Sequence, residues 1–283
     1  AQHMGSMTLL GAGTSTSTPA PDAPTNPALT NNASDLTLTW DASVGATTYN
    51  VYRGTSSGGE TLLASGQAGS PYVDSAVTGG THYYYKVSAV NAGGESALSS
   101  EVDATFTATL VDDTFTDTNG TNITSHTIAP TNTPATSWTV GKGTADIQSN
   151  TMNVTGLTSA YYVAAVDAAV ADCTVQVTAN ATGSWGPVGR YGSGTSFWSA
   201  YAAMGGATLY LIEDNAVNRA TAAGLSISAN DVVKLIMSGT SLTAWHSSGS
   251  CNYTSSAKQA NTSHGVYGET VGRRFDNFKI TVP

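Results

Sequence analysis

Five residues in the second half of the chain have side chains suited to contact with a ligand: Trp185, Arg190, Tyr191, Trp198 and Trp245. The face of an aromatic ring packs against the C–H face of a sugar, while neighbouring polar groups fix the sugar hydroxyls. The guanidinium of Arg190 can donate paired hydrogen bonds to sugar hydroxyls or to a uronate. These residue types favour carbohydrate recognition. For each tryptophan the alternative is ordinary core packing, and for Arg190 it is a surface salt bridge.

Alternation along the strand that contains Trp245 predicts which way its ring points. Successive side chains of a β-strand point to opposite faces of the sheet. Leu242 and Ala244 are typical core residues and share one face, so Thr243 and Trp245 must occupy the other. We therefore expect Trp245 to be exposed, as a platform on which a sugar could stack.

The sequence offers few groups for catalysis. Glu213 and Asp214 come nearest to the paired carboxylates of a glycosidase, but neighbouring strand residues point apart, so we interpret the pair as the solvated end of a hairpin. His126, His246 and His264 lack the spacing of a catalytic zinc site. We expect no catalytic residues and no enzyme activity. A glycoside hydrolase stays an alternative only if one of the two carboxylates faces a cleft.

Charge is scarce in this chain and negative in sum. Of the 283 residues 10% are charged, and the net charge is −9; a typical soluble domain has roughly 25% charged residues. Neither half has the basic stripe that binding to a phosphate backbone requires, so we expect no nucleic-acid partner. No apolar run approaches the ~20 residues of a membrane-spanning helix, so we expect no membrane insertion.

Strands must position the candidate residues, because the chain alternates apolar and polar residues with a period of two. Residues 36–40 and 173–178 show the pattern clearly. It is typical of half-buried antiparallel strands, and helical periodicity is almost absent. The sequence therefore predicts an all-β fold in which ligand-binding groups lie on loops or on one exposed face of a sheet.

Residues 24–106 resemble a fibronectin type III domain. Pro24 precedes the first strand, and Trp40 ends the strand LTLTW at the position of the core tryptophan of that family. The stretch 80–91 matches the corner and the long strand of the family, with Tyr83 as the corner tyrosine. The resemblance implies an immunoglobulin-like sandwich that acts as a spacer.

Residues 1–23 are interpreted as a cloning remnant followed by a linker. A Gly-Ser pair between two methionines marks residues 1–7 as the remnant, and the hydroxyl- and proline-rich stretch that follows is typical of an extended linker. We therefore expect the chain to be part of something larger, with one domain at 24–106 and a second at 109–283.

Residues 109–283 resemble the concanavalin A-like and laminin G-like jelly rolls. They open with an Asp-x-Phe strand at 111–115, close with an Asp-Asn-Phe strand at 274–280, and contain many short alternating strands between. The resemblance implies a two-sheet jelly-roll sandwich, larger than the first sandwich. Members of this superfamily are commonly sugar-binding modules, lectins, and virion or adhesin domains.

The two resemblances together imply a non-catalytic carbohydrate-binding module presented on a fibronectin type III spacer. Its source would be a secreted polysaccharide-active enzyme or a surface protein, so we expect an extracellular location. The expected partner is a polysaccharide or a cell-surface glycan. The alternative is an adhesin or receptor-binding domain of a phage virion, which would lie on the virion surface.

Two further features would stabilise the second domain. A structural calcium ion is expected between the first and last strands, which are adjacent in many such jelly rolls, with Asp112, Asp113 and Asp276 as its hard oxygen ligands. The alternative is that these are turn and capping carboxylates. Cys173 and Cys251 are predicted to form a disulfide, as an extracellular location permits; two buried free thiols are the alternative.

Overall fold

The computed structural model describes residues 18–128, 137–179, 184–193, 195–203, 207–214 and 217–282. Within these residues the regular structure consists of strands and one 3₁₀ turn, η1 (Ile123–Ser125), so the predicted all-β class is confirmed. No helix in this part of the chain is both long and apolar enough to cross a membrane. The predicted remnant and most of the predicted linker lie outside the described residues.

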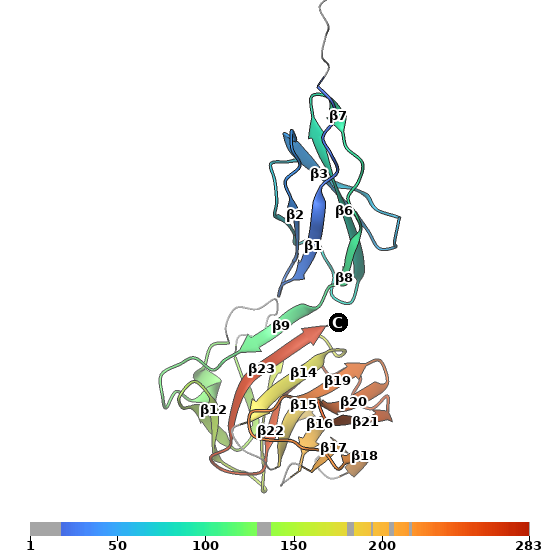
Figure 1. The fold of residues 1–283 in the computed structure, drawn as a ribbon. Coiled ribbons are helices and arrows are strands. Elements are labelled where there is room, and N and C mark those ends of the chain that lie inside the picture. The colour runs from blue at the N-terminus through green and yellow to red at the C-terminus, as the bar shows by residue number, and fades with distance from the viewer. Residues whose placement is uncertain are drawn as a thin grey trace, which may run out of the picture. The chain divides into compact units, whose positions relative to one another are not determined.

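The chain divides into two compact units (Figure 1). Of the described residues, the first contains 18–30, 36–74 and 82–104, and the second contains 31–35, 75–81 and those from 105 onward. Each unit is a sandwich of two β-sheets, and each has a core of its own.

The first unit has the sheet order of an immunoglobulin-like sandwich, as predicted. One sheet runs β1-β2-β5, and the other runs β4-β3-β6-β7 with β8 beside β6. The strands are β1 (Thr25–Asn31), β2 (Leu36–Asp41), β3 (Thr48–Gly54), β4 (Thr61–Gln67), β5 (Tyr72–Asp74), β6 (His82–Asn91), β7 (Gly94–Glu95) and β8 (Val102–Thr105). The predicted immunoglobulin-like architecture is confirmed, and the bounds 24–106 stay a prediction.

Alternation in β2 builds half of this core. Leu36, Leu38 and Trp40 point inward and are buried, whereas the residues between them are half-buried. A buried carboxylate is held at the edge of the core: Asp74 accepts a hydrogen bond from the hydroxyl of Tyr85 at 2.7 Å and one from Arg53 at 2.6 Å. These charge-assisted bonds offset the cost of removing the carboxylate from water.

The second unit is the larger two-sheet sandwich that the sequence predicts. A seven-stranded sheet has the order β10-β13-β22-β15-β16-β17-β18, and an eight-stranded sheet has the order β11-β12-β23-β14-β19-β20-β21 with β9 beside β23. The strands of the seven-stranded sheet are β10 (Thr139–Lys142), β13 (Tyr162–Asp167), β22 (Ser263–Gly268), β15 (Trp185–Ser193), β16 (Ser196–Ala202), β17 (Thr208–Glu213) and β18 (Val217–Ala223). Those of the eight-stranded sheet are β9 (Ala108–Asp113), β11 (Thr144–Ile147), β12 (Met152–Gly156), β23 (Arg274–Val282), β14 (Thr174–Ala179), β19 (Val233–Ser238), β20 (Ser241–His246) and β21 (Gly249–Thr254).

The two sheets bury one continuous core between them. The central strands β14, β19 and β20 of the eight-stranded sheet each send alternate residues into it: Val175, Val177, Val233, Leu235, Met237, Leu242 and Ala244. Because the strands are in antiparallel register, the residues between these form a second layer on the outer face of the same sheet. In Figure 1 these three strands lie side by side with β23 and β21.

Candidate functional site

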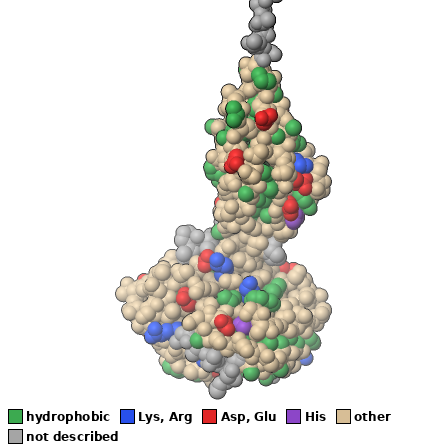
Figure 2. Space-filling view, viewed as in Figure 1, with side chains coloured by type: hydrophobic (Ala, Val, Ile, Leu, Met, Phe, Trp, Pro, Cys, Tyr) green, Lys and Arg blue, Asp and Glu red, His purple; other side chains and the backbone are tan. Residues whose placement is uncertain are grey.

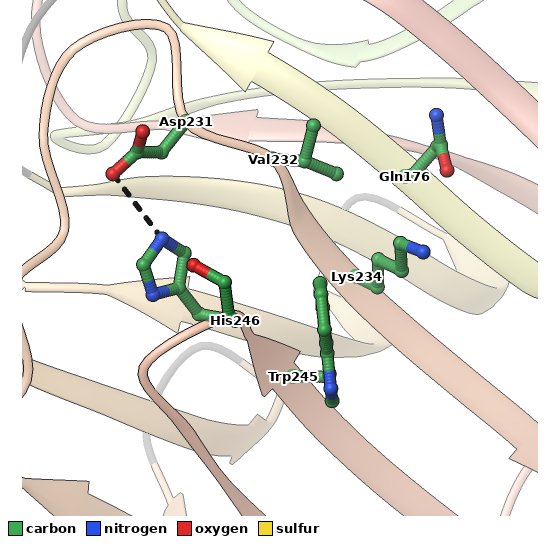
Figure 3. A pocket seen from close by; sticks show the side chains of 7 residues that line it. Gln176, Asp231, Val232, Lys234, Trp245 and His246 are labelled. Atoms are coloured by element: carbon green, nitrogen blue, oxygen red, sulfur yellow. Dashed lines mark hydrogen bonds and ion pairs between the residues drawn. The ribbon is translucent and has the colours of Figure 1, made fainter.

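A hollow of about 330 Å³ opens on the outer face of the eight-stranded sheet. Its lining comes from β14, from β19 with the two residues before it, and from the end of β20 (Figure 3). The lining residues are Gln176, Asp231, Val232, Lys234, Trp245, His246 and Ser247. One large aromatic ring among amide, ammonium, imidazole and hydroxyl groups is the composition that suits a ligand with both apolar and polar faces.

Trp245 faces outward, as the alternation of side chains along β20 predicts. Leu242 and Ala244 are fully buried in the core, whereas Thr243 and Trp245 are half-buried on the other face. The predicted division of faces along this strand is therefore confirmed. Figure 3 shows the indole of Trp245 standing edge-on between Lys234 and His246.

The hairpin turn between β19 and β20 determines which residue lies beside Trp245. The turn consists of Gly239 and Thr240, and Gly239 has a φ of +54°. Two-residue turns between antiparallel strands favour residues that adopt positive φ, and their length fixes the register. Counting back along both strands places Lys234 directly opposite Trp245.

Trp245 is paired with Ser250 of β21 on one side and with Lys234 on the other, and from Trp245 to β9 this row of paired residues crosses five strands. Gln176 is paired with Lys234 on one side and with Lys279 on the other. Asp112 of β9 is paired with Lys279 and ends the row. Because neighbouring strands lie about 4.8 Å apart, the row spans roughly 19 Å. Figure 2 shows that most of the surface on the side seen there is neither hydrophobic nor charged.

The ammonium of Lys234 lies over the indole ring of Trp245, 4.7 Å from its centroid. It forms no ion pair with a carboxylate in the part of the chain that the structure describes. By contrast, Lys279 is paired with Asp112 at 2.7 Å. The hollow thus contains a cation that lies against an aromatic face and forms no ion pair within the described residues.

His246 and Asp231 form the opposite wall of the hollow. The Nδ1 atom of His246 accepts hydrogen bonds from the backbone N–H and the hydroxyl of Ser248, at 3.1 and 2.7 Å. Since Nδ1 is an acceptor, Nε2 carries the proton and donates to Asp231 at 3.2 Å. Asp231 also accepts from the backbone N–H of Ser228 at 2.8 Å, and both bonds are to its Oδ2 atom.

This network has the residue types of a Ser-His-Asp triad, but its geometry is that of a turn. Ser248 lies two residues from His246, and its own backbone N–H shares the Nδ1 lone pair that a general base would need. The Ser248 hydroxyl also accepts a hydrogen bond from Ser226, at 3.3 Å. Local bonds of this kind stabilise turns. We therefore interpret the network as the support that holds this wall of the hollow.

Trp185 and Trp198, both predicted to contact a ligand, lie in the core between the two sheets. Each has 0% of its surface exposed. The indole N–H of Trp198 donates to the carbonyl of Ala257 at 3.3 Å. Neither ring can support a sugar, so these two predictions are wrong. Alternation correctly separates Trp198 from its neighbours Phe197 and Ser199, but it does not tell which face the other sheet covers.

Arg190 is fully buried as well, and the predicted ligand contact is wrong for it too. Its Nη2 atom donates to Asp172 at 2.9 Å and to the carbonyl of Gly239 at 2.6 Å. The guanidinium thus ties the loop before β14 to the β19–β20 turn. Tyr191 is half-buried in the seven-stranded sheet, against Phe197 and its neighbours, and does not line the Trp245 hollow. A ligand contact at Tyr191 stays a prediction.

The three aspartates predicted to bind calcium do not converge. Asp112 is paired with Lys279, and Asp113 points the other way, where it is buried and accepts hydrogen bonds from Trp138 at 2.8 Å and His126 at 2.9 Å. Asp276 accepts from the backbone N–H of the residue that follows it. Among the described residues no group of three His, Cys, Asp or Glu side chains could hold a metal ion. The predicted ligand set is therefore wrong, and calcium binding stays a prediction without a site.

The predicted disulfide is also wrong, because Cys173 and Cys251 are free thiols, both buried. Cys173 precedes β14 and Cys251 lies in β21, with β19 and β20 between them. Three strand spacings of about 4.8 Å exceed the ~7 Å limit for the Cα atoms of a disulfide. Burial raises the pKa of Cys173 to about 12, which keeps this thiol protonated and unreactive.

Glu213 and Asp214 lie where the sequence analysis puts them, at the end of a strand. Glu213 is the last residue of β17, and Asp214 has a φ of +55° in the turn. Burial raises the pKa of Glu213, but hydrogen bonds from Lys258 and Arg219 outweigh it, so the net pKa is lowered. A general acid needs a raised pKa. The two ion pairs make Glu213 a structural anchor of this hairpin.

Three residues of the site were not predicted from the sequence: Lys234, Gln176 and Asp231. A signal for Lys234 was present: it is the polar residue of an otherwise apolar strand, and the short turn that follows sets it opposite Trp245. Gln176 alternates with Val175 and Val177 in the same way. Nothing in the sequence places Asp231, which depends on the loop before β19.

Comparison with known proteins finds similarity over parts of the chain. No family model matches. An amylopullulanase of Thermoanaerobacterium saccharolyticum is 40% identical over 82 residues, which are 28% of this chain and 6% of that protein. The tail tube protein gp17.1* of Bacillus phage SPP1 is 38% identical over 90 residues, 32% of this chain and 33% of that protein. Chitinase A1 of Niallia circulans is 31% identical over 243 residues, 82% of this chain and 33% of that protein.

The chain spans a third or less of the length of these curated relatives. Among solved structures, a Fn3-like protein from Clostridium thermocellum is 40% identical, with a TM-score of 0.29, and the match covers 31% of this chain and 94% of that one. The carbohydrate-binding module CBM66 from Bacillus subtilis is 14% identical, with a TM-score of 0.41, and the match covers 53% of this chain and 98% of that module.

Proposed function

We propose that the second unit is a non-catalytic carbohydrate-binding domain that holds a sugar against Trp245. The observation that carries the proposal is the hollow itself. All five tryptophans of the chain lie in the described part, and Trp245 is the only one of them that is not buried. A half-buried indole at the wall of an open hollow is the arrangement in which an aromatic ring contacts a ligand rather than the protein core.

The groups around Trp245 match the polar part of a sugar. The amide of Gln176 and the hydroxyl of Ser247 can both donate and accept hydrogen bonds, and Lys234 donates. An apolar C–H face of the ligand would be removed from water against the indole, which contributes roughly 25 cal/mol per Å² of buried apolar surface. The ring therefore provides most of the affinity in this proposal, and the polar groups provide orientation.

The comparisons support the setting of this domain. Similarity to parts of an amylopullulanase and of a chitinase favours a place beside polysaccharide-active enzymes, within a longer secreted chain. In that setting the first unit acts as a spacer, because its core and its partly buried ion pairs are those of a self-contained sandwich. Extracellular location and a polysaccharide or surface glycan as partner belong to the same proposal.

A phage virion is the second setting that an observation favours, namely the similarity to a phage tail tube protein. There the domain would act as an adhesin that binds a bacterial surface receptor. The residues around Trp245 would bind a surface glycan in the same way. Binding of a protein receptor would not depend on the indole of Trp245. Adhesion of the whole chain to bacterial cells that survives enzymatic removal of their surface glycans would favour this second setting.

The proposal is tested by screening the whole chain against a panel of soluble and insoluble polysaccharides. We expect saturable binding to at least one member and a loss of at least tenfold in affinity for Trp245→Ala, because the stacking surface is gone. Tyr210→Ala is the matched control: it removes a half-buried aromatic ring from β17 of the seven-stranded sheet, at a position for which no ligand contact is predicted, and should leave affinity unchanged. Binding to no polysaccharide, or equal binding by Trp245→Ala and the wild type, would contradict the proposal.

A hydrolytic role for Ser248, His246 and Asp231 is tested separately. A nucleophilic serine would react with a fluorophosphonate probe, and Ser248→Ala would abolish that reaction. We expect no labelling at Ser248 and unchanged binding in the variant. Labelling that Ser248→Ala removes would show that the domain is an esterase or related hydrolase.

A further inference from the structure

Lys234 is the only lysine or arginine among the described residues that line the Trp245 hollow, and its charge is unpaired. The one carboxylate in the lining, that of Asp231, is bonded to His246 and to the backbone N–H of Ser228. Figure 3 shows Asp231 directed toward His246, on the far side of Trp245 from Lys234. The carboxylate of Asp231 therefore forms no ion pair with Lys234.

The position of the ammonium over the ring has a consequence for the ligand. A cation on the face of an aromatic ring is attracted by the ring's quadrupole. A neutral sugar that stacked on that face would have to displace the ammonium and would give it no charged partner in return. A sugar with a carboxylate would satisfy the ammonium at the moment that its ring took the place beside the indole.

We infer that the ligand of the Trp245 hollow is an acidic polysaccharide, with a uronate carboxylate paired to Lys234. This inference rests on the proposed carbohydrate-binding function and names the substrate class of that same site. The net charge of the chain is −9, so long-range electrostatic attraction does not favour an acidic polysaccharide. Recognition must come from Lys234 at short range.

The chain offers a matched control in the same row of the sheet. Lys279 lies two strands from Lys234, beyond Gln176, and on the same outer face. Its ammonium is already paired with Asp112 at 2.7 Å. Removing the charge of Lys279 changes the net charge of the protein as much as removing that of Lys234, but it removes no unpaired cation.

The experiment compares polygalacturonate with its fully methyl-esterified form, which has the same sugar backbone without the charge. For the whole wild-type chain we expect about fivefold tighter binding to the acidic polymer, the ratio that one partly exposed ion pair gives. Lys234→Gln should lose this preference, whereas Lys234→Arg and Lys279→Gln should keep it. Raising the ionic strength should weaken binding to the acidic polymer alone.

Alginate and dextran sulfate complete the comparison. A Lys234-dependent preference for alginate over neutral polymers supports the inference even if polygalacturonate does not bind, whereas binding to dextran sulfate alone would overturn it in favour of a sulfate site. Equal affinity for acidic and neutral polymers, or a preference that Lys234→Gln retains, would overturn the inference and leave the proposed function standing. Binding to no polysaccharide in the wider panel would overturn both.

Discussion

The two sheets of the second unit differ in how the aromatic residues on their outer faces are packed. On the outer face of the seven-stranded sheet, Tyr161, Phe197 and Tyr267 are at most 5% exposed and pack on one another. The hydroxyls of Tyr201 and Tyr267 both donate to Glu269. On the eight-stranded sheet a single indole stands in an open hollow beside an unpaired ammonium.

The difference shows that the number of aromatic residues does not mark a binding site. The seven-stranded face is richer in aromatic rings, but its rings contact one another, and the hydroxyls of Tyr201 and Tyr267 already have a partner. Burial, with Glu269 beside it, raises the pKa of Tyr201 to about 12, as expected for a closed cluster. The eight-stranded face has one ring whose outer surface and polar neighbours are free to contact something else.

The largest effect should come from opening the closed cluster. Phe197→Ala removes a ring that is 0% exposed, so we expect the free energy of unfolding to fall by about 3–5 kcal/mol. Denaturant unfolding measures this loss. Affinity for polysaccharide, measured under conditions in which the variant is still folded, should not change. A large loss of affinity with little loss of stability would mean that the cluster, and not the Trp245 hollow, binds the ligand.

Acid should also act on the seven-stranded sheet. Burial lowers the pKa of His264 in β22 to about 4. Since an unfolded histidine titrates near pH 6.5, the unfolded state binds the proton first as the pH falls. Stability is therefore lost progressively between about pH 6.5 and pH 4, by about 3 kcal/mol in all. Unfolding measured across this range should show the loss in the wild type.

The control for this pH dependence is His264→Gln, which has no titrating ring at that position. We expect the variant to be less stable than the wild type at neutral pH. Its free energy of unfolding should not include the loss caused by protonation of His264, so the values for the two proteins should converge as the pH falls to 4. If the free energy of unfolding changed with pH in the same way in both proteins, protonation of His264 would not be the cause of the loss of stability.

The smallest effect concerns calcium. Because Asp276 has no carboxylate partner in the described structure with which to hold an ion, Asp276→Ala should leave the response of the melting temperature to millimolar calcium unchanged. Thermal melts in calcium and in excess chelator measure this response for both proteins. A calcium-dependent rise in the melting temperature that Asp276→Ala abolishes would restore the ligand set predicted from the sequence.

The sequence predicts most of the fold because alternation and turns are local properties. It places strands at β2, β14, β19 and β20, and the face of Trp245 follows from Leu242 and Ala244. It cannot predict which face of a strand is covered by the other sheet. Trp198 therefore looks like a surface residue as readily as Trp245 does, although one lies in the core and the other does not.

Contacts between strands that are distant in the sequence also cannot be predicted from the sequence. Arg190 looks like a free guanidinium until the fold brings Asp172 and Gly239 to it. Cys173 and Cys251 look like partners until the strand order separates them. Such contacts depend on long-range topology, which a local pattern does not contain.

The most direct test of binding at Trp245 is its fluorescence. The other four tryptophans are at most 5% exposed, so a ligand in the hollow should change the emission of Trp245 alone. Titration with a polysaccharide that the panel identifies should give a saturable change in the wild type. In Trp245→Phe, where four tryptophans remain, that change should be absent. The same saturable change in Trp245→Phe would place the ligand elsewhere and contradict the account.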